Sequence, residues 1–171
     1  IRINPEDEYK INKIRWKFPK DIKSGNILHI TFCVCKGGDI HQFKEKLKDI
    51  PLVVEFRNYY WHSERSLTFL QENHMGYCIV DEPKLKGLMP YNPKATTDTG
   101  YFRFHGRNTN WFNASLAERY DYLYTPEELK SFLPGIMNIS GITGKTIVMF
   151  NNCHAGKSVK NAIEMLNLIK E

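Results

Sequence analysis

Short apolar runs alternate with helix-forming segments along most of this chain, and this alternation limits the possible folds more than any other feature. Runs rich in branched and aromatic side chains predict strands at residues 27–35, 52–57, 77–81, 101–105 and 146–150. Helical patterns are found at 40–49, at 63–73, from 125 onward and at 157–170. This order favours an α/β fold with a parallel sheet, either a barrel or a doubly wound sheet. No GxGxxG or GxxxxGK[ST] motif follows a predicted strand, which weakens the nucleotide-binding alternative.

The helix that starts near residue 125 has the clearest local signature. Thr125 and Glu128 have the spacing of a capping box, and Pro126 occupies the first helical position. Pro134 is expected to kink or shorten this helix, because it lacks an N–H and crowds the preceding turn. In the last helix, the apolar stripe is formed by Val159, Ala162, Ile163, Leu166 and Ile169.

The composition is that of a folded domain. Hydrophobic residues make up 42% of the 171 residues and charged residues 25%, which is too apolar for a disordered chain. The length suits one domain, so we assign residues 1–171 to a single unit. Since neither a run of 18 apolar residues nor a signal peptide is found, we expect a cytoplasmic protein without membrane contact.

The charge and the cysteines point to no specific partner. Lys and Arg number 24 against 19 Asp and Glu, but the lysines are scattered, so the net charge of +5 favours an anionic partner only weakly. Cys33, Cys35, Cys78 and Cys153 form no CxxC pair, so we expect free thiols rather than a zinc site.

Charged and polar side chains occupy the C-terminal halves of several predicted strands. Alternate residues of a strand share a face, so Glu55 and Arg57 point one way, and so do Arg103 and His105. A parallel sheet places its site at the carboxyl ends of its strands. We therefore expect one mouth formed by Glu55, Arg57, Asp81, Arg103, His105 and Asn151.

The sequence leaves two alternatives to a ligand site at this mouth. One is a structural ion-pair network, with Glu55 paired to Arg103 or Asp81 paired to Arg57, that braces the strand ends. The other is a metal site, for which Glu55, Asp81 and His105 are the only plausible ligands. The neighbouring arginines disfavour a cation there, so we predict no metal.

Further candidate ligand contacts lie beside the strand ends. Gly106 lets a backbone approach a ligand closely, and Arg107 supplies a planar fork for carboxylate or phosphate. Tyr101, Arg107, Asn108, Trp111, Asn151 and Asn152 complete the set of predicted ligand-binding residues.

Several strings of this chain resemble the YecE-like family, also called domain of unknown function seventy-two. They are residues 54–58 with Trp61, 80–83, 101–108 with Trp111, 119–124, 150–152 and 161–162. Their order and spacing agree over about residues 51–168. The resemblance implies a TIM-like barrel whose central pocket is formed by the strand-end residues, and it brings no established activity.

The N-terminal part departs from the family pattern. Members of the family are longer, with two further strands and an early glycine-rich segment, so the chain corresponds to the C-terminal two-thirds of the pattern. Residues 15–20 resemble the third strand of the family, whereas 21–39 fit poorly. We therefore expect an incomplete barrel. Either the member is truncated or divergent, or segments ahead of residue 1 or within 20–50 are missing here.

Three functions remain open from the sequence. The first is an enzyme, a hydrolase or lyase by analogy with other barrels, that acts on an anionic, phosphorylated or sugar-like small molecule. Arg57, Arg103 and Arg107 would bind the substrate, Glu55 or Asp81 would act as the base, and His105 as acid or electrophile. The others are a nucleic-acid-associated protein, suggested by the basic charge and the Arg/Tyr-rich segment 101–124, and a non-catalytic family member. The sequence indicates no particular cofactor or oligomeric state.

Overall fold

The expected alternation of strands and helices is present in the computed structural model of the protein, which describes residues 2–3, 28–32 and 50–170. Six parallel strands lie side by side in chain order: β1 (Arg2–Ile3), β2 (Leu28–Phe32), β3 (Leu52–Phe56), β4 (Gly76–Asp81), β5 (Thr99–Phe104) and β6 (Lys145–Phe150). The helices are α2 (Glu64–Glu72), α3 (Leu116–Arg119), α4 (Pro126–Ile142) and α5 (Lys157–Lys170), with 3-10 turns η2 (Tyr59–Trp61) and η3 (His154–Gly156). The predicted α/β class is confirmed.

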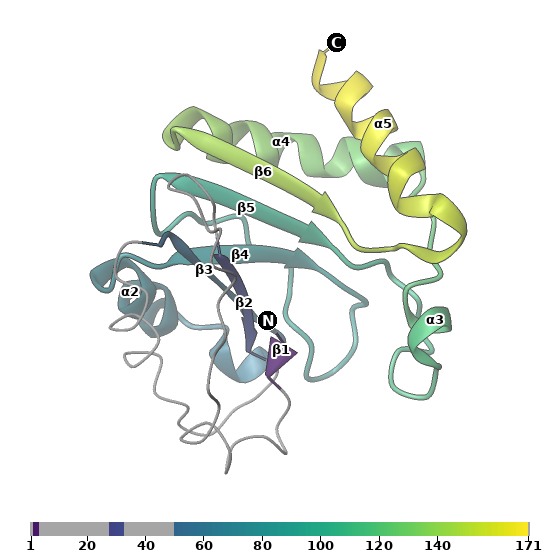
Figure 1. The fold of residues 1–171 in the computed structure, drawn as a ribbon, viewed down its shortest axis with the longest axis horizontal. Helices are drawn as coiled ribbons and strands as arrows, with labels where there is room; N and C mark the ends of the chain where they lie inside the picture. Colours follow the sequence, from purple (N-terminus) through teal and green to yellow (C-terminus); the bar gives the residue numbers. More distant parts are fainter. Residues whose placement is uncertain (1, 4–27, 33–49, 171) are drawn as a thin grey trace.

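Helices α4 and α5 cover one face of the sheet (Figure 1). On that face the rings of Phe104 and Phe132 lie 4.6 Å apart, and the rings of Phe104 and Phe150 lie 5.1 Å apart. Phe56 is stacked on Trp61 with ring centroids 5.0 Å apart. These aromatic side chains are the core of the helix-covered face. The polar residues that alternate with them along β3 and β5 therefore lie on the opposite face.

The predicted elements agree closely with the described ones. Strands β3 to β6 match the predicted runs within two residues at each end. The first predicted strand contains β2, while its residues 33–35, the predicted helix 40–49 and the segment 15–20 lie outside the described residues. Of the described strands, β1 and β6 form the two edges, so these six strands are not closed into a ring.

Helix α4 confirms the capping box and corrects one prediction. The Thr125 hydroxyl accepts the Glu128 N–H, and the Glu128 carboxylate accepts the Thr125 N–H in return. Pro134 was expected to kink or shorten the helix, and the shortening is not seen, because α4 continues to Ile142. Pro134 is exposed, and the buried Phe132 and Ile136 on either side pack into the core. This packing offsets the hydrogen bond that proline removes.

Helix α5 presents most of its apolar stripe to solvent. Val159, Ile163 and Leu166 are 61%, 57% and 52% exposed, whereas Asn161 and Met165 are the buried residues of this helix. The side that packs on the described sheet is therefore not the most apolar one. No helix among the described residues is long and apolar enough to cross a membrane.

Candidate functional site

A single buried carboxylate, that of Glu55, joins two strands on the face opposite the helices. Glu55 has no exposed surface. Its Oε1 accepts a hydrogen bond from Arg57 Nη1 at 3.0 Å, and its Oε2 accepts one from Arg103 Nη1 at 2.6 Å. Because a buried charge is costly unless it is paired, these contacts are what allow Glu55 to be ionised there. We call Glu55, Arg57, Glu82, Arg103, His105 and Asn151 the Glu55 cluster.

The His105 ring is enclosed by Glu55, Arg57 and Asn151. Asn151 Oδ1 accepts from Arg103 Nη2 at 3.1 Å, which turns Asn151 Nδ2 towards His105 Nδ1 at 3.0 Å. His105 Nε2 lies 3.1 Å from Glu55 Oε1, and Arg57 Nη1 lies 2.7 Å from His105 Nε2 and 3.1 Å from Nδ1. Burial, together with the nearby Arg57 charge, lowers the pKa of His105 to about 3. The ring is thus neutral at neutral pH.

Glu82 directly follows β4 and completes the cluster, and it was not among the predicted site residues. Its Oε2 lies 3.0 Å from Arg57 Nη2, outside hydrogen-bond geometry, and its Oε1 accepts the Met89 N–H at 2.9 Å. Burial raises the pKa of Glu82 to about 7, although Arg57 opposes the shift. Burial alone would lower the pKa of Arg57, but Glu82 and Glu55 outweigh it and the pKa is raised.

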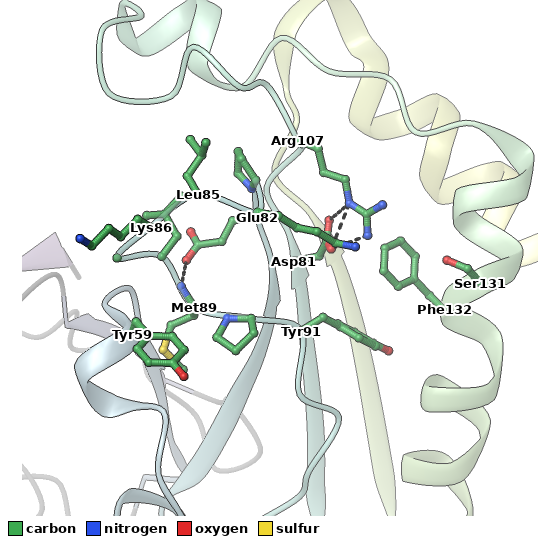
Figure 2. A pocket seen from close by; sticks show the side chains of 15 residues that line it. Tyr59, Asp81, Glu82, Leu85, Lys86, Met89, Tyr91, Arg107, Ser131 and Phe132 are labelled. Atoms are coloured by element: carbon green, nitrogen blue, oxygen red, sulfur yellow. Dashed lines mark hydrogen bonds and ion pairs between the residues drawn. The ribbon is translucent and has the colours of Figure 1, made fainter.

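Asp81 lies on the other face of β4, so the expectation that it joins Glu55 and His105 was wrong. Arg107 binds it through two nitrogens, with Nε 2.9 Å from Oδ2 and Nη2 2.7 Å from Oδ1. The Tyr124 hydroxyl also donates to Oδ2 at 2.7 Å. Figure 2 shows Asp81 beside Arg107, and Glu82 directed to Met89 instead. The anticipated pairing of Asp81 with Arg57 is replaced by the pairing of Glu82 with Arg57.

Arg107 lies with Asp81 on the helix-covered face of the sheet. Its Nη1 donates to Glu128 of α4 at 3.1 Å, and its guanidinium lies 5.1 Å from the Phe132 ring centre. Among the residues predicted to bind ligand, Arg107 is therefore separated from Arg57 and Arg103, which both contact Glu55.

Two of the predicted aromatic residues lie close to the Glu55 cluster. Trp111 is 3% exposed, and the Arg57 guanidinium lies over its ring, 5.3 Å from the centre. Tyr101 is buried on the same face of β5 as Arg103. Trp111 thus adds a cation–π contact to the two carboxylates that contact the Arg57 guanidinium.

Two of the three predicted asparagines, Asn108 and Asn152, have structural contacts away from the Glu55 cluster. Asn108 Nδ2 donates to the Glu118 carbonyl at 2.7 Å and organises an exposed turn. Asn152 is fully buried, and its Nδ2 donates to the Tyr122 carbonyl and to Asn161 Oδ1, both at 2.8 Å. Asn161 in turn accepts the backbone N–H of Tyr124, so this pair fastens the segment after β5 to α5.

The Glu55 cluster brings two guanidinium groups together on one carboxylate. Within residues 50–170, no group of three or more His, Cys, Asp or Glu side chains is placed to hold a metal ion. Arg57 and Arg103 approach Glu55 from two directions, and planar guanidinium groups match carboxylate and phosphate.

Comparison with known proteins identifies the group to which the sequence is related. The family described as "Protein of unknown function DUF72" matches residues 28–171. The chain belongs to the DUF72 family. The resemblance noted from residues 54–58 and 101–108 is thereby confirmed.

Solved DUF72 structures support the same fold. A DUF72 family protein from Thermotoga maritima is 38% identical with a TM-score of 0.75, over 84% of this chain and 58% of that chain. One from Enterococcus faecalis is 26% identical with a TM-score of 0.77, over 85% of this chain and 58% of that chain. The curated UPF0759 protein YunF of Bacillus subtilis is 28% identical over 94% of this chain. The chain spans 58% of the length of this relative.

Proposed function

We propose that the Glu55 cluster binds an anionic small molecule at the carboxyl ends of the strands. The observation that carries the proposal is the placement of Arg57 and Arg103, from two strands, on one buried carboxylate. The side chains of Arg103 and Arg57 keep 24% and 10% of their surface exposed, whereas that of Glu55 keeps none. An incoming anion would therefore meet the guanidinium groups and not the carboxylate.

In this proposal Glu55 and His105 are positioning residues. Glu55 accepts hydrogen bonds from Arg57 and Arg103, and its Oε1 lies 3.1 Å from His105 Nε2, so its lone pairs are directed at the groups it holds. Both nitrogens of His105 have polar partners, and burial and Arg57 lower its pKa to about 3, so the ring is neutral near neutral pH and no imidazolium is present to act as an acid. These contacts favour binding over acid–base catalysis by Glu55 and His105, and an enzymatic role would require the bound molecule to displace them.

A compact anion suits the cluster better than a nucleic acid does. Proteins that follow a phosphate backbone use basic side chains spread over an exposed surface. Arg57 is nearly enclosed by Glu55, Glu82 and the Trp111 ring, so it offers one direction of approach. We propose a phosphorylated or carboxylated small molecule as the ligand, in a cytoplasmic setting.

The test compares Arg103→Ala with Arg65→Ala, an exposed arginine of α2 away from the cluster. Binding of inorganic phosphate, citrate and glucose 6-phosphate is measured by calorimetry and by NMR shifts. We expect at least one probe to bind the parent protein and Arg103→Ala to weaken that binding about tenfold, as for loss of a charged hydrogen bond. Arg65→Ala should bind like the parent protein.

Two results would contradict the proposal. One is that none of the three anions binds the parent protein. The other is that Arg103→Ala and Arg65→Ala bind with the same affinity. Arg103→Lys serves as a further control, because it keeps the charge and loses the planar fork, so intermediate affinity is expected.

A further inference from the structure

A cavity of about 750 Å³ lies beside the segment that follows β4. Figure 2 shows its walls, which come from the segment 83–91, from Tyr59, from Arg107 and from Ser131 and Phe132 of α4. Asp81 and Glu82 also line it, whereas Glu55, Arg103, His105 and Asn151 do not. The cavity is therefore a separate space that meets the Glu55 cluster only at Glu82.

The floor of the cavity is apolar and aromatic. Leu88, Met89 and Phe132 are 9%, 3% and 2% exposed, so they are fixed in the core. The ring of Tyr91 meets that of Phe132 edge-on at 5.1 Å, and the half-exposed Tyr59 stands at another wall. Rings, prolines and a thioether are surfaces on which a flat apolar body packs well.

The charges in the lining leave a positive excess. Asp81 is paired with Arg107, and Glu82 lies against Arg57 outside the lining. Lys84 and Lys86 are exposed, and neither takes part in an ion pair within residues 50–170. The acids of the lining are thus compensated and these two lysines are not, which favours a negatively charged ligand.

The cavity is held open by the backbone around it. The Met89 N–H donates to Glu82 Oε1 at 2.9 Å, and the Tyr59 N–H donates to the Gly87 carbonyl at 3.0 Å. The Leu88 N–H donates to the Leu85 carbonyl at 3.2 Å within the same segment. These bonds tie the segment 83–91 to β4 and to η2. The volume and the mixed lining match small-molecule sites, which are mostly preformed.

We propose that this cavity is a second ligand site, and that it takes an organic anion with a flat, ring-shaped apolar body. The ring packs on Met89 and Phe132, and the negative group lies towards Lys84 and Lys86. The site differs from the Glu55 cluster in its lining and in its preference for an apolar body over a small polar anion.

The test uses 8-anilinonaphthalene-1-sulfonate, an aromatic sulfonate whose fluorescence rises in apolar surroundings. Ser131→Trp fills the cavity from the exposed side of α4, and Ser140→Trp places the same side chain elsewhere on that helix. We expect Ser131→Trp to lose the saturable component of dye binding and Ser140→Trp to keep it. The dye can also meet the exposed apolar residues of α5, so the difference between the two variants is the readout.

A second variant tests the charge without filling the cavity. Lys84→Ala with Lys86→Ala should weaken dye binding about five- to tenfold, as expected for two exposed charges, and should reduce its salt dependence. Arg103→Ala should leave dye binding unchanged, which separates this site from the Glu55 cluster. Equal dye affinity in Ser131→Trp and Ser140→Trp, or no effect of the lysine substitutions, would overturn the proposal.

Discussion

Replacing Tyr124 by phenylalanine removes one buried hydroxyl that serves two partners. Tyr124 is 1% exposed. Its hydroxyl donates to Asp81 Oδ2 at 2.7 Å and accepts the Gly106 N–H at 2.8 Å. Phenylalanine keeps the ring contacts with Phe104 and Phe132, so the substitution isolates the hydroxyl.

The expected loss follows from these two bonds. A hydrogen bond to a charged group contributes about 1.5–3 kcal/mol, and a buried N–H left without an acceptor costs about 1–3 kcal/mol. Arg107 still neutralises Asp81, which places the total near the lower end, at about 3 kcal/mol. For a chain of this length that corresponds to a fall in Tm of about 6–12 °C.

Urea unfolding and thermal unfolding measure this loss against Tyr122→Phe. The Tyr122 hydroxyl donates to Glu128 Oε1 at 2.7 Å in a half-exposed setting, so its removal should cost about 1 kcal/mol or less. If Tyr124→Phe were no less stable than Tyr122→Phe, the view that the hydroxyl is essential to the Asp81 side of β4 would be refuted.

Three further substitutions test the pH dependence at Glu82 and the backbone conformation at two glycines. Burial raises the pKa of Glu82 from 4.5 to about 7, so ionisation of this carboxyl destabilises the fold as the pH rises through this interval. Urea unfolding at pH 4.5 and pH 7.5 should therefore show that the stability of Glu82→Gln, relative to the parent protein, increases by about 3 kcal/mol between the two pH values. His105, whose pKa is lowered, is present in both proteins, so its titration cancels in the difference. A stability difference between the two proteins that stays constant with pH would contradict the raised pKa of Glu82. Gly106→Ala should destabilise by about 2 kcal/mol or more, because Gly106 has φ +89° and a Cβ would lie 2.7 Å from Tyr122 Cβ. Gly141→Ala, where the added methyl group meets open space on α4, should stabilise the protein by about 0.5–1 kcal/mol. If thermal unfolding showed similar effects for the two alanine substitutions, the argument that Gly106 is required by its backbone conformation would be contradicted.

The strands and the start of α4 were predictable because local pattern decides them. Apolar runs bounded by glycine, proline and charge placed β3 to β6, and the Thr125–Glu128 spacing fixed the start of α4. The length of α4 was not predictable from Pro134, because the free-energy cost of a proline in the helix is small beside the gain from burying Phe132 and Ile136. Tertiary packing outweighs local preference at that point.

The candidate site was predictable where a strand has one polar face. Glu55 and Arg57 alternate with apolar residues, as do Arg103 and His105, so their convergence followed from the period of two residues. Strand β4 is buried on both faces, and its apolar run gives no sign of which way Asp81 points. Only the observation that Asp81 and Glu82 must point to opposite faces would have suggested Glu82 as the partner of Arg57.

The adjacent acids at the end of β4 also discriminate between alignments of that strand. In the native alignment Asp81 lies opposite Phe104, Asp81 faces Arg107, and Glu82 faces Arg57. A slip of one residue would turn every β4 side chain to the other face, and the apolar run before Asp81 would tolerate it. A slip in either direction would place one acid at the position of the other, so one of the two arginines would keep a carboxylate and the other would lose its partner, which destabilises the slipped alignment. The Asp81–Glu82 pair thus favours the native register of β4 over a register shifted by one residue.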